Sequence, residues 1–118
     1  MTRRRVLVLA IVLAVLPAPV ASHSLLVAAT PPADARLEVG PPEVVLRFNS
    51  RIEKRLSRLR LVNDRGEARA LTPSVDGAPE ELRAPVPPLA AGTWRLEWRV
   101  LSVDGHVVSG GYSFHVVR

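Results

Sequence analysis

The amino-acid sequence predicts an all-β protein, an antiparallel sandwich or Greek-key barrel built from six or seven short strands. Prolines and glycines, 11 and 7 of them, are spread along a chain of 118 residues and break it into short segments. Several of these segments alternate apolar and polar residues with a period of two, as half-buried strands do. Short strands at close spacing with turn residues between them are typical of sandwiches and barrels. The length allows one domain.

The first strands lie between proline-containing turns. Residues 24–29 are a short apolar run that predicts an edge strand, and residues 35–39 are too short to classify. Residues 43–48 predict a clearer strand, because alternate positions are apolar and would share one face. These positions are Val44, Leu46 and Phe48.

Basic residues gather in the next segment, at Arg51, Lys54, Arg55, Arg58 and Arg60. A cluster of this kind could contact phosphate or membrane lipid. However, Leu59 and Leu61 alternate with the last two arginines, as in a half-buried strand. We therefore interpret the cluster as a solvated face of the protein.

The second half of the chain contains the clearest strand pattern. After a turn at residues 63–66, the predicted strands are 67–71, 81–84, 93–100 and 110–117. Alternation predicts that the core side chains of the last two strands are Trp94, Leu96, Trp98, Val100, Tyr112, Phe114 and Val116. His115 falls on the opposite face of its strand, and we do not expect it to be a ligand.

The first 22 residues have the pattern of a secretory signal peptide. Arg3–Arg5 provide the positive start, an apolar run spans residues 6–16, and small residues precede the predicted cleavage at Ser22–His23. The run is shorter than the roughly 20 residues of a membrane-spanning helix. An uncleaved anchor that continues to Val27 is the alternative, but two prolines and a histidine would interrupt it. We expect residues 23–118 to form the mature domain, and we expect this domain to be periplasmic or secreted.

Charge and sulfur content restrict what this domain can bind. Three of the 16 basic residues are Arg3–Arg5, which leaves 13 basic against 11 acidic residues beyond the signal peptide. This small excess, without a recognised module, gives no indication of nucleic-acid binding. The chain has no cysteine, and Met1 is its only methionine. A metal would therefore be held by imidazole, carboxylate or amine groups, which argues against a soft Cu(I) site.

The stretch from Ser102 to His106 lies between the two clearest strands. Asp104-Gly105 is a strong hairpin signal, because both residues accept the positive φ of a tight turn. A turn alone does not require His106. Asp and His in this spacing can converge on one ion, either from one strand face or around the glycine turn.

A further pair of ligands would come from the predicted N-terminus of the mature chain. His23 would supply both its amine and its ring nitrogen. Together with Asp104 and His106 this makes three nitrogens and one oxygen, a set that suits the square arrangement of Cu(II). Zn(II) would prefer a tetrahedron, and Ca(II) or Mg(II) more oxygens. The residues therefore predict a site for one Cu(II) ion.

Several motifs of the mature chain resemble the CopC family of exported copper-resistance proteins. They are His-Ser at 23–24, Pro-Pro-Ala-Asp-Ala at 31–35, Val-Val-Leu-Arg-Phe at 44–48, Ala-Gly-Thr-Trp-Arg-Leu-Glu-Trp-Arg-Val at 91–100, Ser-Val-Asp-Gly-His-Val-Val-Ser-Gly at 102–110 and Tyr-Ser-Phe-His-Val at 112–116. The resemblance implies an immunoglobulin-like β-sandwich of about seven strands that binds Cu(II) through His23, Asp104 and His106. It also implies a CopD-type inner-membrane copper transporter as partner. The methionine-rich Cu(I) site of some members should be absent here.

Three functions are compatible with these residues. The first is a monomeric, non-catalytic carrier or buffer of Cu(II), which contributes to copper resistance or homeostasis and to import with the CopD-type partner. The second is a copper oxidase resembling lytic polysaccharide monooxygenases, which also use an N-terminal histidine chelate. The short chain and a carboxylate in the copper plane argue against it. The third is a metal-free structural sandwich, in which Asp104-Gly105 is only a turn. No nucleophile elbow supports a hydrolase.

Overall fold

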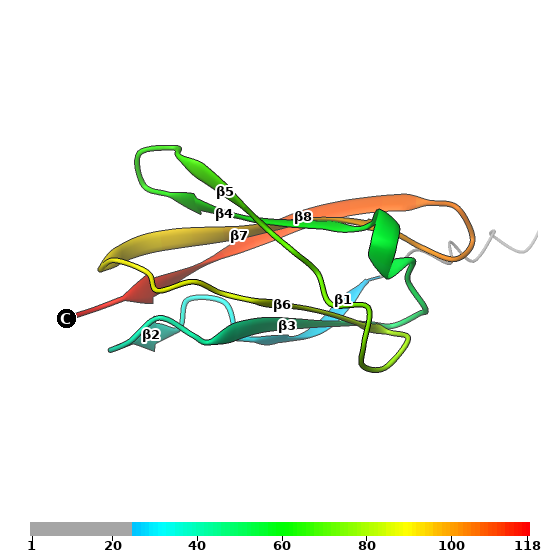
Figure 1. The fold of residues 1–118 in the computed structure, drawn as a ribbon, viewed down its shortest axis with the longest axis horizontal. Helices are drawn as coiled ribbons and strands as arrows, with labels where there is room; N and C mark the ends of the chain where they lie inside the picture. Colours follow the sequence, from blue (N-terminus) through cyan, green and yellow to red (C-terminus); the bar gives the residue numbers. More distant parts are fainter. Residues whose placement is uncertain (1–24) are drawn as a thin grey trace, which may run out of the picture.

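Two β-sheets pack face to face in the computed structural model, which describes residues 25–118 (Figure 1). The first sheet has the order β1 (Leu26–Thr30), β3 (Glu43–Phe48), β6 (Glu81–Pro85). The second has the order β2 (Arg36–Leu37), β8 (Val107–Val116), β7 (Gly92–Leu101), β4 (Arg58–Asn63), β5 (Ala68–Leu71). A short 3-10 helix, η1 (Lys54–Leu56), precedes β4. The predicted all-β sandwich is confirmed.

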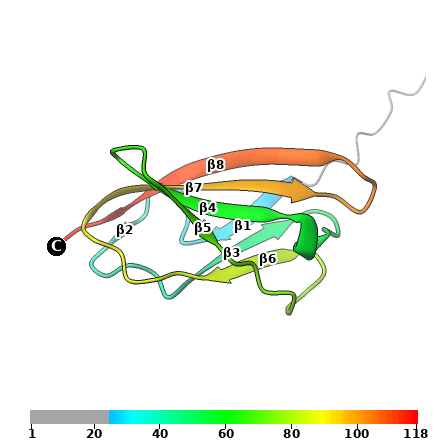
Figure 2. The same cartoon turned by 45° about the horizontal axis from the view of Figure 1, so that its top comes forward.

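The hairpin of β7 and β8 forms the centre of the larger sheet. Both strands have ten residues, and they pair without interruption from Gly92 opposite Val116 to Leu101 opposite Val107. At about 3.3 Å per residue, each of these ten-residue strands spans about 33 Å. β7 lies in the middle of the sheet because β4 pairs along its other edge. The hairpin loop therefore marks one end of the molecule, and the end of β8 marks the other (Figures 1 and 2).

The core lies between the two sheets and is apolar, apart from the hydroxyls of Tyr112 and of two buried serines. Alternation along each strand decides which residues reach it, because successive side chains point to opposite faces. The fully buried residues of both sheets include Val44, Leu46, Leu61, Leu82, Leu96, Val100 and Phe114. The inward face predicted for β3 and for the end of β8 is confirmed. Within residues 25–118, no helix has the length and apolarity needed to cross a bilayer.

The two tryptophans differ from the expectation that both are core residues. Trp94 and Trp98 are only partly buried and pack against the edge of the core. Trp98 makes an edge-on contact with Phe48, with ring centroids 6.4 Å apart, and a tilted contact with Tyr112 at 6.0 Å. Trp94 donates its indole N–H to the Ala90 carbonyl at 2.9 Å. Each large ring thus keeps one side toward the surface.

Strand boundaries also differ from the sequence prediction. The part of the chain that the structure describes has eight strands, and the additional one is the two-residue β2, in the segment that was too short to classify. β2 pairs in parallel with β8, through Arg36 opposite His115. β8 begins at Val107, three residues before the predicted start, because it pairs with the end of β7. β1 is shifted to Leu26–Thr30 and is the predicted edge strand.

Candidate metal centre

The loop between β7 and β8 carries two of the three predicted ligands, Asp104 and His106. Two backbone hydrogen bonds close this loop: Gly105 donates to the Ser102 carbonyl at 2.9 Å, and Ser102 donates to the His106 carbonyl at 2.8 Å. Gly105 has φ +90°, which a side chain would make unfavourable. Residues 103–105 thus form a three-residue loop with a left-handed glycine at its end, which is a common way to join two antiparallel strands.

Asp104 does not use the positive φ that both residues of the turn can accept. Gly105 alone does so in this loop, so Asp104 has another role. Its Oδ1 accepts the backbone N–H of His106 at 3.0 Å. An aspartate that binds the backbone two residues ahead is a common local turn. The hairpin-turn interpretation therefore holds, and it accounts for one oxygen of the carboxylate.

The second carboxylate oxygen lies beside the histidine ring. Asp104 Oδ2 is 3.2 Å from Nδ1 of His106. The His106 side chain is 61% exposed and the Asp104 side chain 25% exposed, so solvent reaches both groups. The turn thus places a carboxylate oxygen and an imidazole nitrogen next to one another at the surface.

The segment after β3 packs against the base of this loop. Ile52 forms a bridge with Ser102, and Val103 donates its N–H to the Arg51 carbonyl at 3.3 Å. Ser57 adds a buried connection, because its hydroxyl donates to the Glu53 carbonyl at 2.8 Å and accepts the Leu101 N–H at 3.2 Å. These contacts hold the end of β7, and with it the loop, against the segment that connects β3 to β4. Sequence reasoning gave Ser57 no role.

The start of the described chain lies at the same end of the sandwich (Figures 1 and 2). Asn49 fixes it from both sides: its Oδ1 accepts the Leu25 N–H at 2.8 Å, and its own N–H donates to the Leu25 carbonyl at 2.9 Å. Asn49 is only two residues from Arg51, which contacts the β7–β8 loop. The third predicted ligand, His23, lies outside the described residues. Asn49 was not singled out in the sequence, although an asparagine directly after a strand is a plausible signal for such an anchor.

Among residues 25–118, no group of three or more His, Cys, Asp or Glu side chains could hold a metal ion. His115, which was not expected to be a ligand, lies in β8 far from the loop. Its Nδ1 is 3.0 Å from the hydroxyl of Thr93, the residue opposite it in β7. The described part of the chain therefore offers Asp104 and His106 as a pair, and a complete site needs donors from elsewhere.

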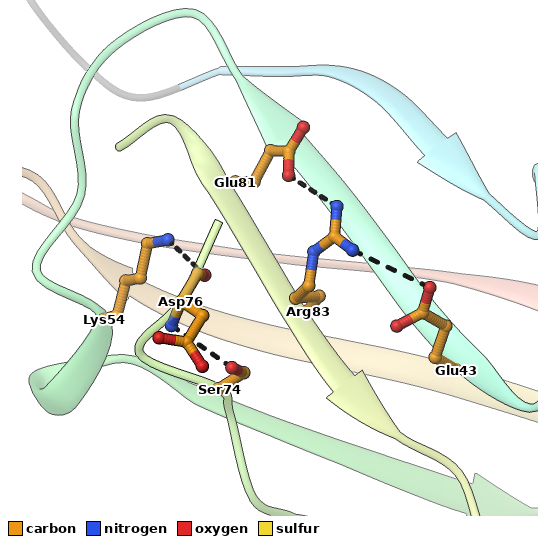
Figure 3. A network of polar contacts seen from close by, with 6 residues as sticks. All are labelled: Glu43, Lys54, Ser74, Asp76, Glu81 and Arg83. Carbon is orange, nitrogen blue, oxygen red and sulfur yellow. Dashed lines mark hydrogen bonds and ion pairs between the residues drawn. The ribbon is translucent and has the colours of Figure 1, made fainter. Parts of the chain in front are cut away.

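A second cluster of charged side chains lies on β3 and β6 (Figure 3). Arg83 contacts Glu81 at 2.7 Å and Glu43 at 3.8 Å, so both carboxylates face the same guanidinium. The hydrogen bond from Arg83 lowers the pKa of Glu81, and the same bond raises the pKa of Arg83. Nearby, Lys54 donates to the Asp76 carbonyl at 2.7 Å. The cluster is an internally paired network and does not resemble a metal site.

A comparison with protein-family models matches residues 26–117 to the CopC domain. The chain belongs to the CopC family. This confirms the family predicted from the motifs, and members of this family are copper-binding carriers rather than enzymes. The match covers all strands of both sheets, so the family relationship extends over the whole sandwich.

Similar proteins include Protein YobA of Escherichia coli K12 and Copper resistance protein C of Pseudomonas syringae pv. tomato. The first is 30% identical over 98 residues, which cover 80% of this chain and 79% of the relative. The second is 27% identical over 109 residues, covering 80% and 81%. Solved structures match as well, including the following two. CopC from Methylosinus trichosporium OB3b has a TM-score of 0.74 and 35% identity, covering 80% of this chain and 93% of that one. PcoC from Escherichia coli, described as a methionine-rich copper resistance protein, has a TM-score of 0.68 and 27% identity, covering 81% and 100%.

Proposed function

We propose that this CopC-family chain is an exported carrier or buffer of Cu(II), which binds one ion through His23, Asp104 and His106. The observation that carries the proposal is the position of Leu25. Its two hydrogen bonds with Asn49 place the start of β1 at the end of the sandwich where Asp104 and His106 lie side by side. Copper is the cargo in this proposal, and no chemical reaction is involved.

The length of chain between Leu25 and His23 supports this assignment. Two residues span at most about 7 Å. Cleavage at Ser22–His23 would therefore leave the new amine and the imidazole close to the anchored end of β1. Asn49, Arg51 and Val103 connect that end to the hairpin loop through backbone contacts. A longer or unanchored segment would be less favourable, because bringing His23 to Asp104 and His106 would cost more conformational entropy.

The donor atoms also fit the proposed cargo. Two donors that are about 2 Å from one ion at a right angle are about 2.8 Å apart. The 3.2 Å between Asp104 Oδ2 and His106 Nδ1 is close to this spacing. An imidazole, a carboxylate and an N-terminal chelate make a nitrogen-rich set that suits Cu(II). The single methionine of the chain, Met1, gives no basis for a methionine-rich Cu(I) site.

The cellular role follows from the same site. A signal peptide, residues 1–22, would direct export of the domain, and its removal would create the amine ligand, so the complete copper site would form only outside the cytoplasm. Copper resistance or homeostasis is the expected result, with a CopD-type inner-membrane transporter as the acceptor when copper is imported. The domain would act as a monomer, since one chain supplies all the ligands.

Electron paramagnetic resonance of the Cu(II)-loaded mature chain tests the ligand set. We expect nitrogen couplings that change in His106→Ala and remain in His115→Ala, the matched control at a histidine distant from the loop. A spectrum that is unchanged in His106→Ala would contradict the assignment. Affinity should also fall at lower pH, because copper competes with protons for an amine whose ordinary pKa is about 8.

One extra residue before His23 tests the N-terminal ligands separately. It removes the free amine from the histidine while leaving both side chains of the loop unchanged. We expect the Cu(II) affinity to fall by at least about tenfold, measured by competition with a chelator of known affinity. Undiminished affinity would remove His23 from the site. A flat titration of the correctly processed chain would instead favour a metal-free structural sandwich.

A further inference from the structure

The outer face of the larger sheet carries an excess of positive charge. Strand alternation places Arg58 and Arg60 of β4 on this face, together with Arg95, Glu97 and Arg99 of β7. Four guanidinium groups and one carboxylate give a net charge of +3 for these five residues. Residues 25–118 as a whole carry 13 basic and 11 acidic side chains, a net charge of +2. The rest of the described chain therefore has a net charge of −1, so the basic character is concentrated on one face.

The single carboxylate of this face is already engaged. Glu97 Oε2 accepts hydrogen bonds from Nε and Nη2 of Arg60, at 3.0 Å and 2.8 Å. On the other side, Nε of Arg95 lies 3.7 Å from Glu97 Oε1. The small Gly111 lies beneath the Arg95 guanidinium, which a Cβ at that position would meet at 2.7 Å. Arg60 and Arg95 thus share the carboxylate of Glu97, which is not paired with Arg58 or Arg99.

Arg58 and Arg99 are the two arginines that remain. They occupy directly opposite positions of β4 and β7, where Cβ atoms are about 4.5–5.5 Å apart. Neither guanidinium has a carboxylate partner among residues 25–118. Like charges at opposite positions destabilise a sheet. A bound anion would remove this repulsion.

A hollow of about 450 Å³ lies at these two residues. Arg58, Arg60 and Arg99 line it, and its remaining sides include Ala70, Glu97 and Ser109. The small side chains of Ala70 and Ser109 flank the long arginines across the sheet, since Ala70 is opposite Arg60 and Ser109 is opposite Arg99. The arginines therefore surround an open depression that has room for a small ligand.

We propose that this hollow binds a phosphate group between Arg58 and Arg99, a function separate from the copper site. Each guanidinium presents a planar pair of N–H donors that matches two oxygens of a phosphate. A phosphate has enough oxygens to bridge two adjacent guanidinium groups. A carboxylate has only two oxygens, and one guanidinium can occupy both of them. The Ser109 hydroxyl, opposite Arg99, is a further donor at the rim. The phosphate is either a free ion or the headgroup of an anionic lipid, and these two sources are distinguishable.

The first arm of the test is a ¹⁵N NMR titration of the metal-free mature chain with orthophosphate, with chloride at matched ionic strength as the reference. We expect phosphate-specific shifts at Arg58, Arg99 and Ser109. In the double variant Arg58→Gln/Arg99→Gln the apparent affinity should fall by about tenfold or more. The matched control is Arg36→Gln/Arg47→Gln, which removes the same charge from exposed positions elsewhere and should stay within about twofold of the parent. Circular dichroism confirms that both variants are folded.

The second arm identifies the source of the phosphate, by co-sedimentation with vesicles of phosphatidylglycerol or phosphatidylcholine. Binding to phosphatidylglycerol that is lost in Arg58→Gln/Arg99→Gln, and kept in the control, assigns the site to a lipid headgroup. A response to orthophosphate without vesicle binding assigns it to free phosphate. Equal responses to phosphate and chloride, or equal losses in the two double variants, would overturn the proposal. Binding of a glutamate-rich peptide when neither phosphate source binds would overturn it as well, in favour of an acidic protein partner.

Discussion

Replacing Gly110 with alanine should destabilise the sandwich, because Trp98 occupies the space that the new methyl group needs. Gly110 lies directly opposite Trp98 in the β7–β8 hairpin. A Cβ at Gly110 would lie 2.4 Å from Cζ2 and 2.7 Å from Cε2 of the Trp98 ring. The ring is also held by its contacts with Phe48 and Tyr112, so a shift away from Gly110 would disturb both neighbours.

The size of the effect follows from two opposing contributions. Inserting a methyl group into a packed site costs about 1–3 kcal/mol. Replacing glycine with alanine at an accessible backbone conformation recovers about 0.4–1 kcal/mol, because the unfolded chain loses freedom. Gly110 does not have positive φ, so the gain applies. We expect a net loss of about 1–2 kcal/mol, which corresponds to roughly 5–15 °C in melting temperature for a domain of this size.

The neighbouring residue Gly111 provides the matched control. A Cβ there would face outward and meet the Arg95 guanidinium at 2.7 Å and the Leu96 carbonyl oxygen at 3.0 Å. The arginine is long and can move into solvent, so Gly111→Ala should cost less than about 1 kcal/mol. Urea unfolding followed by tryptophan fluorescence measures both variants. If Gly110→Ala is as stable as Gly111→Ala, the argument that Trp98 fills the site is wrong.

Two further predictions concern the hydrogen bonds that hold the N-terminal segment. Burial raises the pKa of Tyr112 to about 12, and its hydroxyl donates to the Pro31 carbonyl at 2.5 Å. The unfolded chain therefore ionises first, and the free energy of unfolding should fall as pH rises from about 10 to about 12. Tyr112→Phe should lose about 1 kcal/mol at neutral pH and abolish this alkaline dependence, and a parent profile that is flat above pH 10 would contradict it. Asn49→Ala removes the acceptor of the Leu25 N–H. We expect a several-fold lower Cu(II) affinity by chelator competition with the sandwich still folded, and an unchanged affinity would show that this anchor does not position the copper site.

Strands with strict alternation were predictable because local pattern and tertiary packing agree in them. In β7 the alternation of Trp94, Leu96, Trp98 and Val100 with charged residues identified both the strand and its inward face, and Leu96 and Val100 are fully buried. The beginning of β8 was missed for a physical reason. The missed residues are Val107, Val108 and Ser109, where two adjacent valines interrupt the period-two alternation, and pairing with the end of β7 includes them in the strand. The two-residue β2 exists only through its parallel pairing with β8, which no local pattern encodes.

The candidate sites show the same division between local and long-range information. Asp104, Gly105 and His106 are close in sequence, so the turn and the pair of polar groups could be read directly. The role of Asn49 depends on the pairing of β1 with β3, and the arginine hollow depends on the register of β4 against β7. Register is a long-range property, set by which faces are buried. The sequence pattern therefore indicated that Arg58 and Arg60 lie on a solvated face. It did not show that Arg99 lies opposite Arg58.

The position of the hairpin loop has a practical consequence for anyone who labels or immobilises this protein. β8 leads from the loop to the far end of the sandwich, where Arg118 lies (Figure 1). A purification tag, dye or surface linker at Arg118 is therefore about 33 Å of strand away from Asp104 and His106. The same group placed before Leu25 would lie beside them. Attachment at the carboxyl end keeps the loop accessible, and attachment at the amino end would interfere with it.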